Sequence, residues 1–150
     1  MNRKPEIDDG IRQAIDQLLA RSAEKFQSGD LLGAVEFGIQ AWDLIPEPKS
    51  SWDYYPQSLS RTFVEDFAKL GDKENVRKWI AILAEMYGDP NHEDHLVLTT
   101  EADAMIALGD HDRAYYVVDR IFEIYGDKSF RDKNSPLLKF YMTEKAKRDG

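Results

Sequence analysis

The segment richest in potential metal ligands and bases is Asp89-Pro90-Asn91-His92-Glu93-Asp94-His95. Two histidines three positions apart share one face of a helix, and together with the carboxylates between them they could bind a divalent metal. The rest of the sequence supplies no obvious further ligands. Polar residues and an N-cap aspartate are also common in a connector between helices. We therefore expect the segment to connect two helices and to hold neither a metal nor a cofactor.

Other patterns typical of catalysis are missing from the sequence. The chain has neither a Gly-x-x-x-x-Gly-Lys phosphate loop nor a serine in a nucleophile-elbow pattern. His111 follows a predicted turn, where we expect it to be solvated. We expect a protein that is not an enzyme, and a metal-dependent enzyme built on the His92 segment is the remote alternative.

Three aromatic residues lie close together in a predicted connector at residues 46–56. They are Trp52, Tyr54 and Tyr55. Aromatic side chains are rarely left in water, so we expect this loop to fold back on the helices with one ring exposed. Because exposed aromatic residues anchor many protein interfaces, we include all three among the candidate partner-binding residues.

The elements that must position these residues are helices. Apolar residues recur at helical spacing over residues 11–45, 59–87 and 102–125, and each stretch is broken once by a Gly-Asp pair. A last helix is predicted over residues 136–147, with Ser135 as N-cap and Pro136 in its first turn. No segment alternates as a half-buried strand would, so the fold class is all-α. Trp42, Trp79, Phe122 and Tyr125 fall on the apolar stripes, where we expect core packing.

The second and third of these units repeat one pattern. Leu70-Gly71-Asp72 and Leu108-Gly109-Asp110 are each followed by a Tyr-Gly-Asp sequence, the glycines of each copy are 17 positions apart, and the copies are offset by 38 residues. Periods of this length are typical of stacked helical units that bury their apolar faces against neighbours. The repeat favours a binding protein over an enzyme.

The overall composition and net charge disfavour several classes of partner and location. The 150 residues carry 28 acidic and 20 basic side chains, for a net charge of -8, and no cysteine. That charge disfavours nucleic acid and anionic membranes, and no apolar run approaches the ~20 residues of a membrane helix. The first residues lack the apolar stretch of a secretory signal. We expect an N-terminal tail at residues 1–10, a single domain at residues 11–150, and a cytoplasmic location.

The first unit resembles a tetratricopeptide repeat. Phe26, the Gly29-Asp30 turn, Ala34, Ala41 and Pro46 occur at the relative positions that this family uses. The third unit keeps Gly109-Asp110 and Ala114, and the second keeps only its Gly-Asp turn. The turns recur at intervals of 42 and 38 residues instead of the family's 34, so the repeats are degenerate. The resemblance implies a superhelix of three hairpins closed by a C-terminal capping helix.

In that family the first helix of each hairpin lines a concave groove that binds a protein or peptide. The resemblance places the following residues of this chain there: Asp16, Leu19, Ala23, Arg61, Thr62, Glu65, Lys69, Thr99, Thr100 and Asp103. Some members hold a C-terminal carboxylate with lysines and asparagines, but this chain has Leu19, Arg61 and Thr99 at one of the equivalent positions and Ala23, Glu65 and Asp103 at another. We expect a non-catalytic interaction module with a basic protein or peptide partner, such as an immunity protein or an effector chaperone. A self-associating scaffold that forms a homodimer is the alternative.

Overall fold

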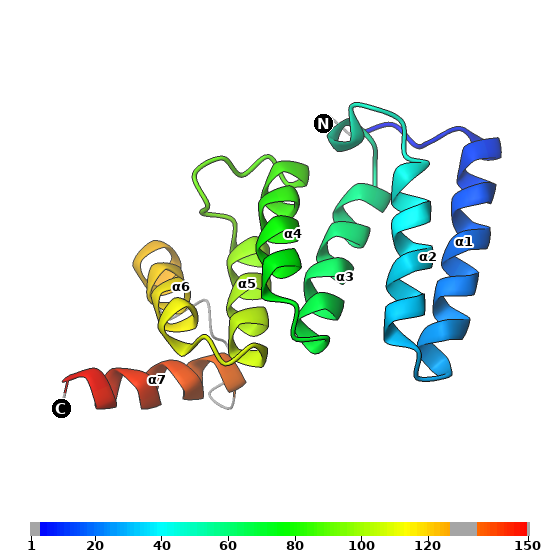
Figure 1. The fold of residues 1–150 in the computed structure, drawn as a ribbon. Helices are drawn as coiled ribbons and strands as arrows, with labels where there is room; N and C mark the ends of the chain where they lie inside the picture. The colour runs from blue at the N-terminus through cyan, green and yellow to red at the C-terminus, as the bar shows by residue number, and fades with distance from the viewer. Residues whose placement is uncertain (1–3, 127–134, 150) are drawn as a thin grey trace.

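The computed structural model describes residues 4–126 and 135–149, and within these ranges the chain forms seven α-helices and no strand. The helices pack pairwise as hairpins in chain order (Figure 1). The pairs are α1 (Asp9–Gln27) with α2 (Leu31–Asp43), α3 (Tyr55–Lys69) with α4 (Lys73–Met86), and α5 (His95–Ala107) with α6 (His111–Tyr125), while α7 (Pro136–Asp149) packs on α6. The predicted all-α arrangement of three hairpins and a terminal helix is confirmed. None of the described helices is long and apolar enough to cross a membrane.

The Gly-Asp pairs form the hairpin turns by one mechanism. In the first turn Gly29 has a φ of 86°, and the backbone N–H of Asp30 donates to the Lys25 carbonyl at 2.9 Å, so that α1 ends in a Schellman motif. The Asp30 side chain then accepts from the Gly33 N–H at 2.9 Å and caps α2. Asp72 and Asp110 cap α4 and α6 in the same way. One dipeptide thus ends one helix and starts the next.

The N-terminal boundary differs from the predicted one. Helix α1 begins at Asp9, and the segment before it packs against the domain. Ile7 is buried in the core, and the Pro5 carbonyl accepts from the Asp53 N–H at 2.9 Å. Lys4 donates from Nζ to the Ser50 carbonyl at 2.7 Å. Residues 4–8 therefore belong to the folded unit.

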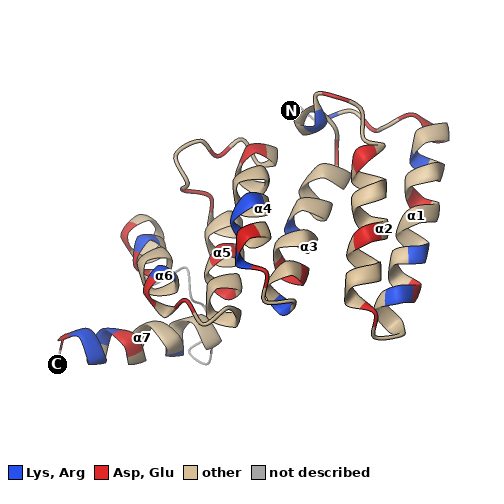
Figure 2. Ribbon diagram, in the orientation of Figure 1, with Lys and Arg blue, Asp and Glu red and all other residues tan. Residues whose placement is uncertain are grey.

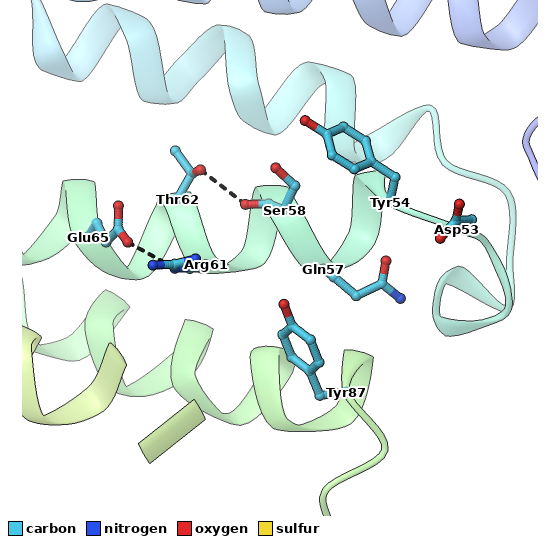
Figure 3. Close-up of a pocket in the computed structure, with 8 residues that line it drawn as sticks. All are labelled: Asp53, Tyr54, Gln57, Ser58, Arg61, Thr62, Glu65 and Tyr87. Carbon is cyan, nitrogen blue, oxygen red and sulfur yellow. Dashed lines mark hydrogen bonds and ion pairs between the residues drawn. The ribbon is translucent and has the colours of Figure 1, made fainter. Parts of the chain in front are cut away.

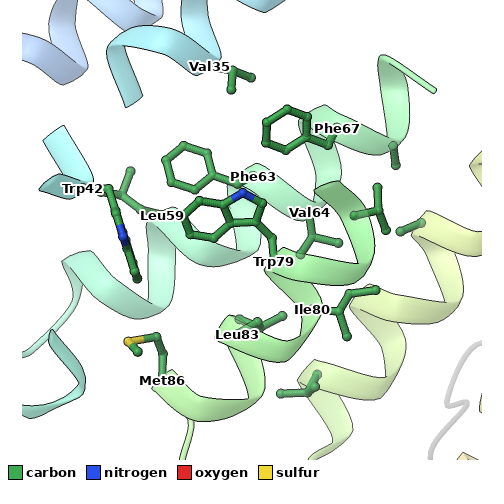
Figure 4. Close-up of a cluster of buried hydrophobic side chains, with 14 of the residues drawn as sticks. Val35, Trp42, Leu59, Phe63, Val64, Phe67, Trp79, Ile80, Leu83 and Met86 are labelled. Carbon is green, nitrogen blue, oxygen red and sulfur yellow. The ribbon is translucent and has the colours of Figure 1, made fainter. Parts of the chain in front are cut away.

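Three aromatic rings from three helices form the centre of the core (Figure 4). Phe63 on α3 lies 4.6 Å from Trp79 on α4 and 6.4 Å from Trp42 on α2, measured between ring centroids. Trp42 and Trp79 are both buried, as predicted. Because α2 and α3 belong to different hairpins, this cluster joins the first hairpin to the second.

The other two predicted core aromatics lie nearer the surface. Phe122 is half-buried and stacks on Tyr141 of α7 at 4.6 Å. Tyr125 is exposed, so its assignment to the core was wrong. It occupies the last turn of α6, where its hydroxyl donates to the Glu93 carbonyl at 2.6 Å. The predicted connector at residues 126–135 lies outside the described residues except at its two ends.

Gly38 allows α2 to approach the aromatic cluster. A Cβ atom at this position would lie 2.7 Å from Cε1 of Phe63, whose ring is held in place by Trp79. We expect Gly38→Ala to lower the free energy of unfolding by at least about 1 kcal/mol, because overpacking outweighs the gain in helix propensity. Urea denaturation measures the change.

Gly10→Ala is the matched control for this substitution. Nothing lies within 4 Å of a Cβ at Gly10, which is also helical. This variant should be as stable as the parent or slightly more stable. Equal stabilities for the two variants would contradict the close approach of α2 to Phe63.

Candidate functional site

Helix α3 is the central element of the candidate site. One side of it is buried against α2, α4 and α5 and includes Phe63, Val64 and Phe67. The opposite side is polar and exposed, and carries Arg61, Thr62, Glu65 and Lys69. The helical period separates the two sides cleanly, because these polar residues recur at positions that share a face.

A pocket of about 520 Å³ opens over the N-terminal half of this exposed face (Figure 3). We call it the tyrosine pocket, because rings from two segments, those of Tyr54 and Tyr87, form part of its wall. Its lining residues are Asp53, Tyr54, Gln57, Ser58, Arg61, Thr62, Glu65 and Tyr87. Most of the lining is polar, and it includes two carboxylates and one guanidinium.

A second pocket of about 370 Å³ lies farther along α3, between the first and second hairpins. We call it the hairpin pocket. It is lined by Leu19, Ser22, Ala23, Phe26, Gln27, Ala34, Thr62, Glu65, Asp66 and Lys69. Thr62 and Glu65 line both pockets, so the two pockets lie next to each other along α3, and together we call them the α3 channel.

The polar groups of the channel are partly paired with one another. Arg61 donates from Nε to Oε1 of Glu65 at 3.2 Å, and the Thr62 hydroxyl donates to the Ser58 carbonyl at 3.0 Å (Figure 3). The Lys69 ammonium lies 5.4 Å from the centre of the Phe26 ring, a cation-π contact at the far end. The side chains that make these contacts remain at the surface. A partner could therefore replace the contacts with contacts of its own.

Asp103 of α5 extends the acidic character of the channel. Desolvation by its packed surroundings raises the pKa of this carboxyl group, the charge of Glu65 raises it further, and the charge of Arg61 opposes both. Helices α3 and α5 pack against each other, which brings Asp103 near enough to α3 to feel the charges of Glu65 and Arg61. The predicted residues Arg61, Glu65 and Asp103 therefore form one local group.

Tyr54, which lines the tyrosine pocket, has an unusual backbone conformation. Its φ of 73° and ψ of -64°, with the Tyr55 N–H donating to the Asp53 carbonyl at 3.0 Å, define the rare and strained form of γ-turn. The ring is 63% exposed at the mouth of the pocket. Such strain is kept only where the surrounding structure enforces it, and it is concentrated at functional sites.

The other connector aromatics have structural partners. Trp52 is half-buried and donates from Nε1 to the Pro46 carbonyl at 2.9 Å. Tyr55 is the first residue of α3, and its hydroxyl donates to Oδ1 of Asp16 at 2.7 Å. Burial and this hydrogen bond raise the pKa of Tyr55 to about 12. Trp52, Tyr55 and Asp16 thus lie outside both pockets of the channel, and Tyr54 is the exposed ring of the loop.

Helix α5 contributes less surface than the repeat register implies. Thr100 is buried, so it is not available to a partner, and Thr99 is half-buried with its hydroxyl donating to the His95 carbonyl at 2.9 Å. The reason is that α3, α4 and α6 all pack against α5, which leaves only Asp103 of the three predicted residues exposed.

The histidine segment takes part in a charge network that we did not predict. His92 lies in the connector with a φ of 57°, and its Nε2 is 2.7 Å from Oε1 of Glu101, a buried residue of α5. Arg113 of α6 donates from Nε to Oε2 of the same carboxylate at 2.9 Å. One feature of the sequence could have revealed the role of Glu101, because it lies on the same helical stripe as the apolar residues Leu98 and Met105.

This network anchors the connector to the third hairpin. Arg120 reinforces it by donating to the carbonyls of His92 and Asn91 at 2.8 and 3.0 Å. His95 is instead the first residue of α5, so the two histidines do not share a helical face. Among the described residues, no group of three or more acidic, histidine or cysteine side chains could hold a metal ion.

No protein-family model matches this chain, and no curated protein or solved structure is significantly similar to it. The class of the molecule is therefore defined by its own architecture, a helical-repeat-like stack of hairpins with a channel along α3.

The conformation of Tyr54 predicts the effect of glycine at this position. We expect Tyr54→Gly to be more stable than Tyr54→Ala by about 1 kcal/mol, because glycine adopts a positive φ without strain. At the exposed α2 residue Glu36 the order should reverse, with alanine more stable than glycine. Chemical denaturation of the four variants measures both differences, and alanine more stable at both positions would contradict the strained turn.

The network at Glu101 predicts a pH-dependent stability. Hydrogen bonding to Glu101 raises the pKa of His92 above its usual 6.5 and outweighs desolvation, which lowers it. Burial raises the pKa of Glu101, but hydrogen bonds from His92 and Arg113 outweigh burial and lower it below 4.5. The charged pair should contribute about 1 kcal/mol between these pKa values. That contribution should be lost as the pH rises through the folded pKa of His92.

Unfolding of the parent and of His92→Gln at several pH values measures this contribution. The stability difference should be largest below pH 6.5 and should shrink at higher pH. His111→Gln is the comparison, since His111 is exposed and its ion pair with Glu144 is longer, at 3.8 Å, so its pH-dependent contribution should be smaller. A difference that grows with pH would contradict the assignment.

Proposed function

We propose that this protein is a non-catalytic interaction module that binds a protein or peptide partner in the α3 channel. The observation that carries the proposal is that two pockets lie next to each other along α3 and share Thr62 and Glu65. Most of its walls come from α1 and α3, the first helices of their hairpins, and the rest from the connector before α3, from Ala34 of α2 and from Tyr87 at the end of α4. In tetratricopeptide repeat proteins, which the chain resembles, the equivalent helices line the surface that binds the partner.

The charge of the molecule favours a basic partner. The net charge is -8, and Figure 2 shows acidic and basic residues on most of the helices, with a group of basic residues at the end of α7. Asp53, Glu65 and Asp103 add negative charge at the channel itself. Electrostatic attraction would speed the encounter, and contacts within the channel would then hold the complex together.

Narrower roles follow from the resemblance. Small acidic proteins with degenerate repeats serve as immunity proteins that neutralise a bacterial toxin or as chaperones of secreted effectors. We propose these two roles as the first to test. A cysteine-free chain suits the reducing cytoplasm, where we propose that the module acts.

A second candidate function is self-association. Tyr116 on α6 and Met142 on α7 are 56% and 57% exposed, and large apolar side chains at the end of a helical stack can pair two copies. Sedimentation at several concentrations separates the candidates. A monomer supports the heterologous binder, whereas a dimer that Met142→Asp disrupts supports the scaffold.

Charge reversal in the channel tests the proposed function. We expect Glu65→Lys with Asp103→Lys to weaken the binding of a partner captured from the source cell at least ten-fold, because two attractive charges become repulsive. The control, Glu36→Lys with Glu123→Lys, makes the same charge change at exposed residues of α2 and α6 and should weaken binding far less. Affinity that is insensitive to salt and equal in the two double variants would contradict the proposal.

A further inference from the structure

The tyrosine pocket contains hydrogen-bond acceptors that lack a partner within the described part of the chain. The half-buried Asp53 carboxylate accepts no hydrogen bond and forms no ion pair there. Oε1 of Gln57 is buried and likewise has no partner. The amide of Gln57 is held in this orientation because its Nε2 lies 3.3 and 3.4 Å from the carbonyls of Trp52 and Met86. A buried unpaired acceptor is costly, so the pocket favours a ligand that donates hydrogen bonds.

The walls of the pocket favour a planar cation. The exposed ring of Tyr54 and the half-buried ring of Tyr87 both line the pocket, and Figure 3 shows the Gln57 amide extending from α3 on the side of Asp53. Tyrosine faces attract cations and stack well on guanidinium groups. The ring of Tyr54 meets the ring of Tyr55 edge-on, with 5.3 Å between the ring centroids.

The charges around the pocket also favour a cation. Arg61 is the one cation among the lining residues, and its Nε already donates to Glu65. Asp53 adds an unpaired negative charge. Burial raises the pKa of Tyr87, the charge of Arg61 opposes this shift, and the charge of Asp94 adds to it. Among the lining residues, two carboxylates, those of Asp53 and Glu65, are present with one guanidinium, so the lining itself carries a net negative charge.

We propose that the tyrosine pocket accepts an arginine side chain of the partner. A guanidinium has five N–H donors, enough to pair with Asp53, Gln57 and a second carboxylate while it stacks on a tyrosine ring. A lysine ammonium has three donors and no plane with which to stack. The inference rests on the proposed function, since it specifies which group of a basic partner enters the channel.

Nuclear magnetic resonance titration of the full-length protein with N-acetyl-L-arginine N-methylamide tests this assignment. We expect saturable shifts of the Gln57 side-chain amide and of the backbone amides of residues 53–58, with a Kd roughly in the millimolar range. The citrulline analogue has the same shape without the charge, and the lysine analogue has the charge without the plane. Both should bind at least ten-fold more weakly.

Asp53→Asn should weaken binding of the arginine derivative several-fold. Asp43→Asn, at an exposed residue of α2 that has no ion pair in the described part of the chain, should leave it unchanged. Shifts that do not saturate, or equal binding of the citrulline or lysine analogue, would overturn the arginine pocket. If the charge-reversed channel variant still loses its partner in that case, the interaction module stands and the pocket assignment alone fails.

Discussion

The packing of Phe63 between Trp79 and the backbone of α2 at Gly38 is the constraint on which the rest of the structure depends. Each hairpin is built locally by a Gly-Asp turn, but these turns do not determine how one hairpin lies against the next. The aromatic cluster does, because its three rings come from both of the first two hairpins. The position of the Phe63 ring in this cluster requires a residue without a side chain at Gly38.

This constraint also gives α3 its role at the surface. With Phe63 and its neighbours committed to the core, the helical period leaves Arg61, Thr62, Glu65 and Lys69 facing outward. The gap between the first two hairpins then becomes the hairpin pocket, and the connector that carries Tyr54 closes the other end of the channel. The same packing that stabilises the fold therefore shapes the candidate binding surface.

Sequence reasoning predicted the local elements well, because their signals are local. The helical periods and the Gly-Asp pairs specified the hairpins, and the repeat register placed Arg61, Thr62, Glu65 and Lys69 on one exposed face. The repeat register could not show that Thr100 is buried, because its burial depends on three other helices that pack around α5. Glu101 and its partners were missed for a similar reason, since His92 reaches that carboxylate only through the path of the connector.

Hydrogen–deuterium exchange of the full-length protein, alone and in complex with its captured partner, tests the central claim most directly. If the partner occupies the α3 channel, exchange should slow in residues 19–27 and 54–69, which form most of its walls. Exchange in α2 and α6 should change little. Protection confined to α6 and α7, with α3 unaffected, would contradict the account.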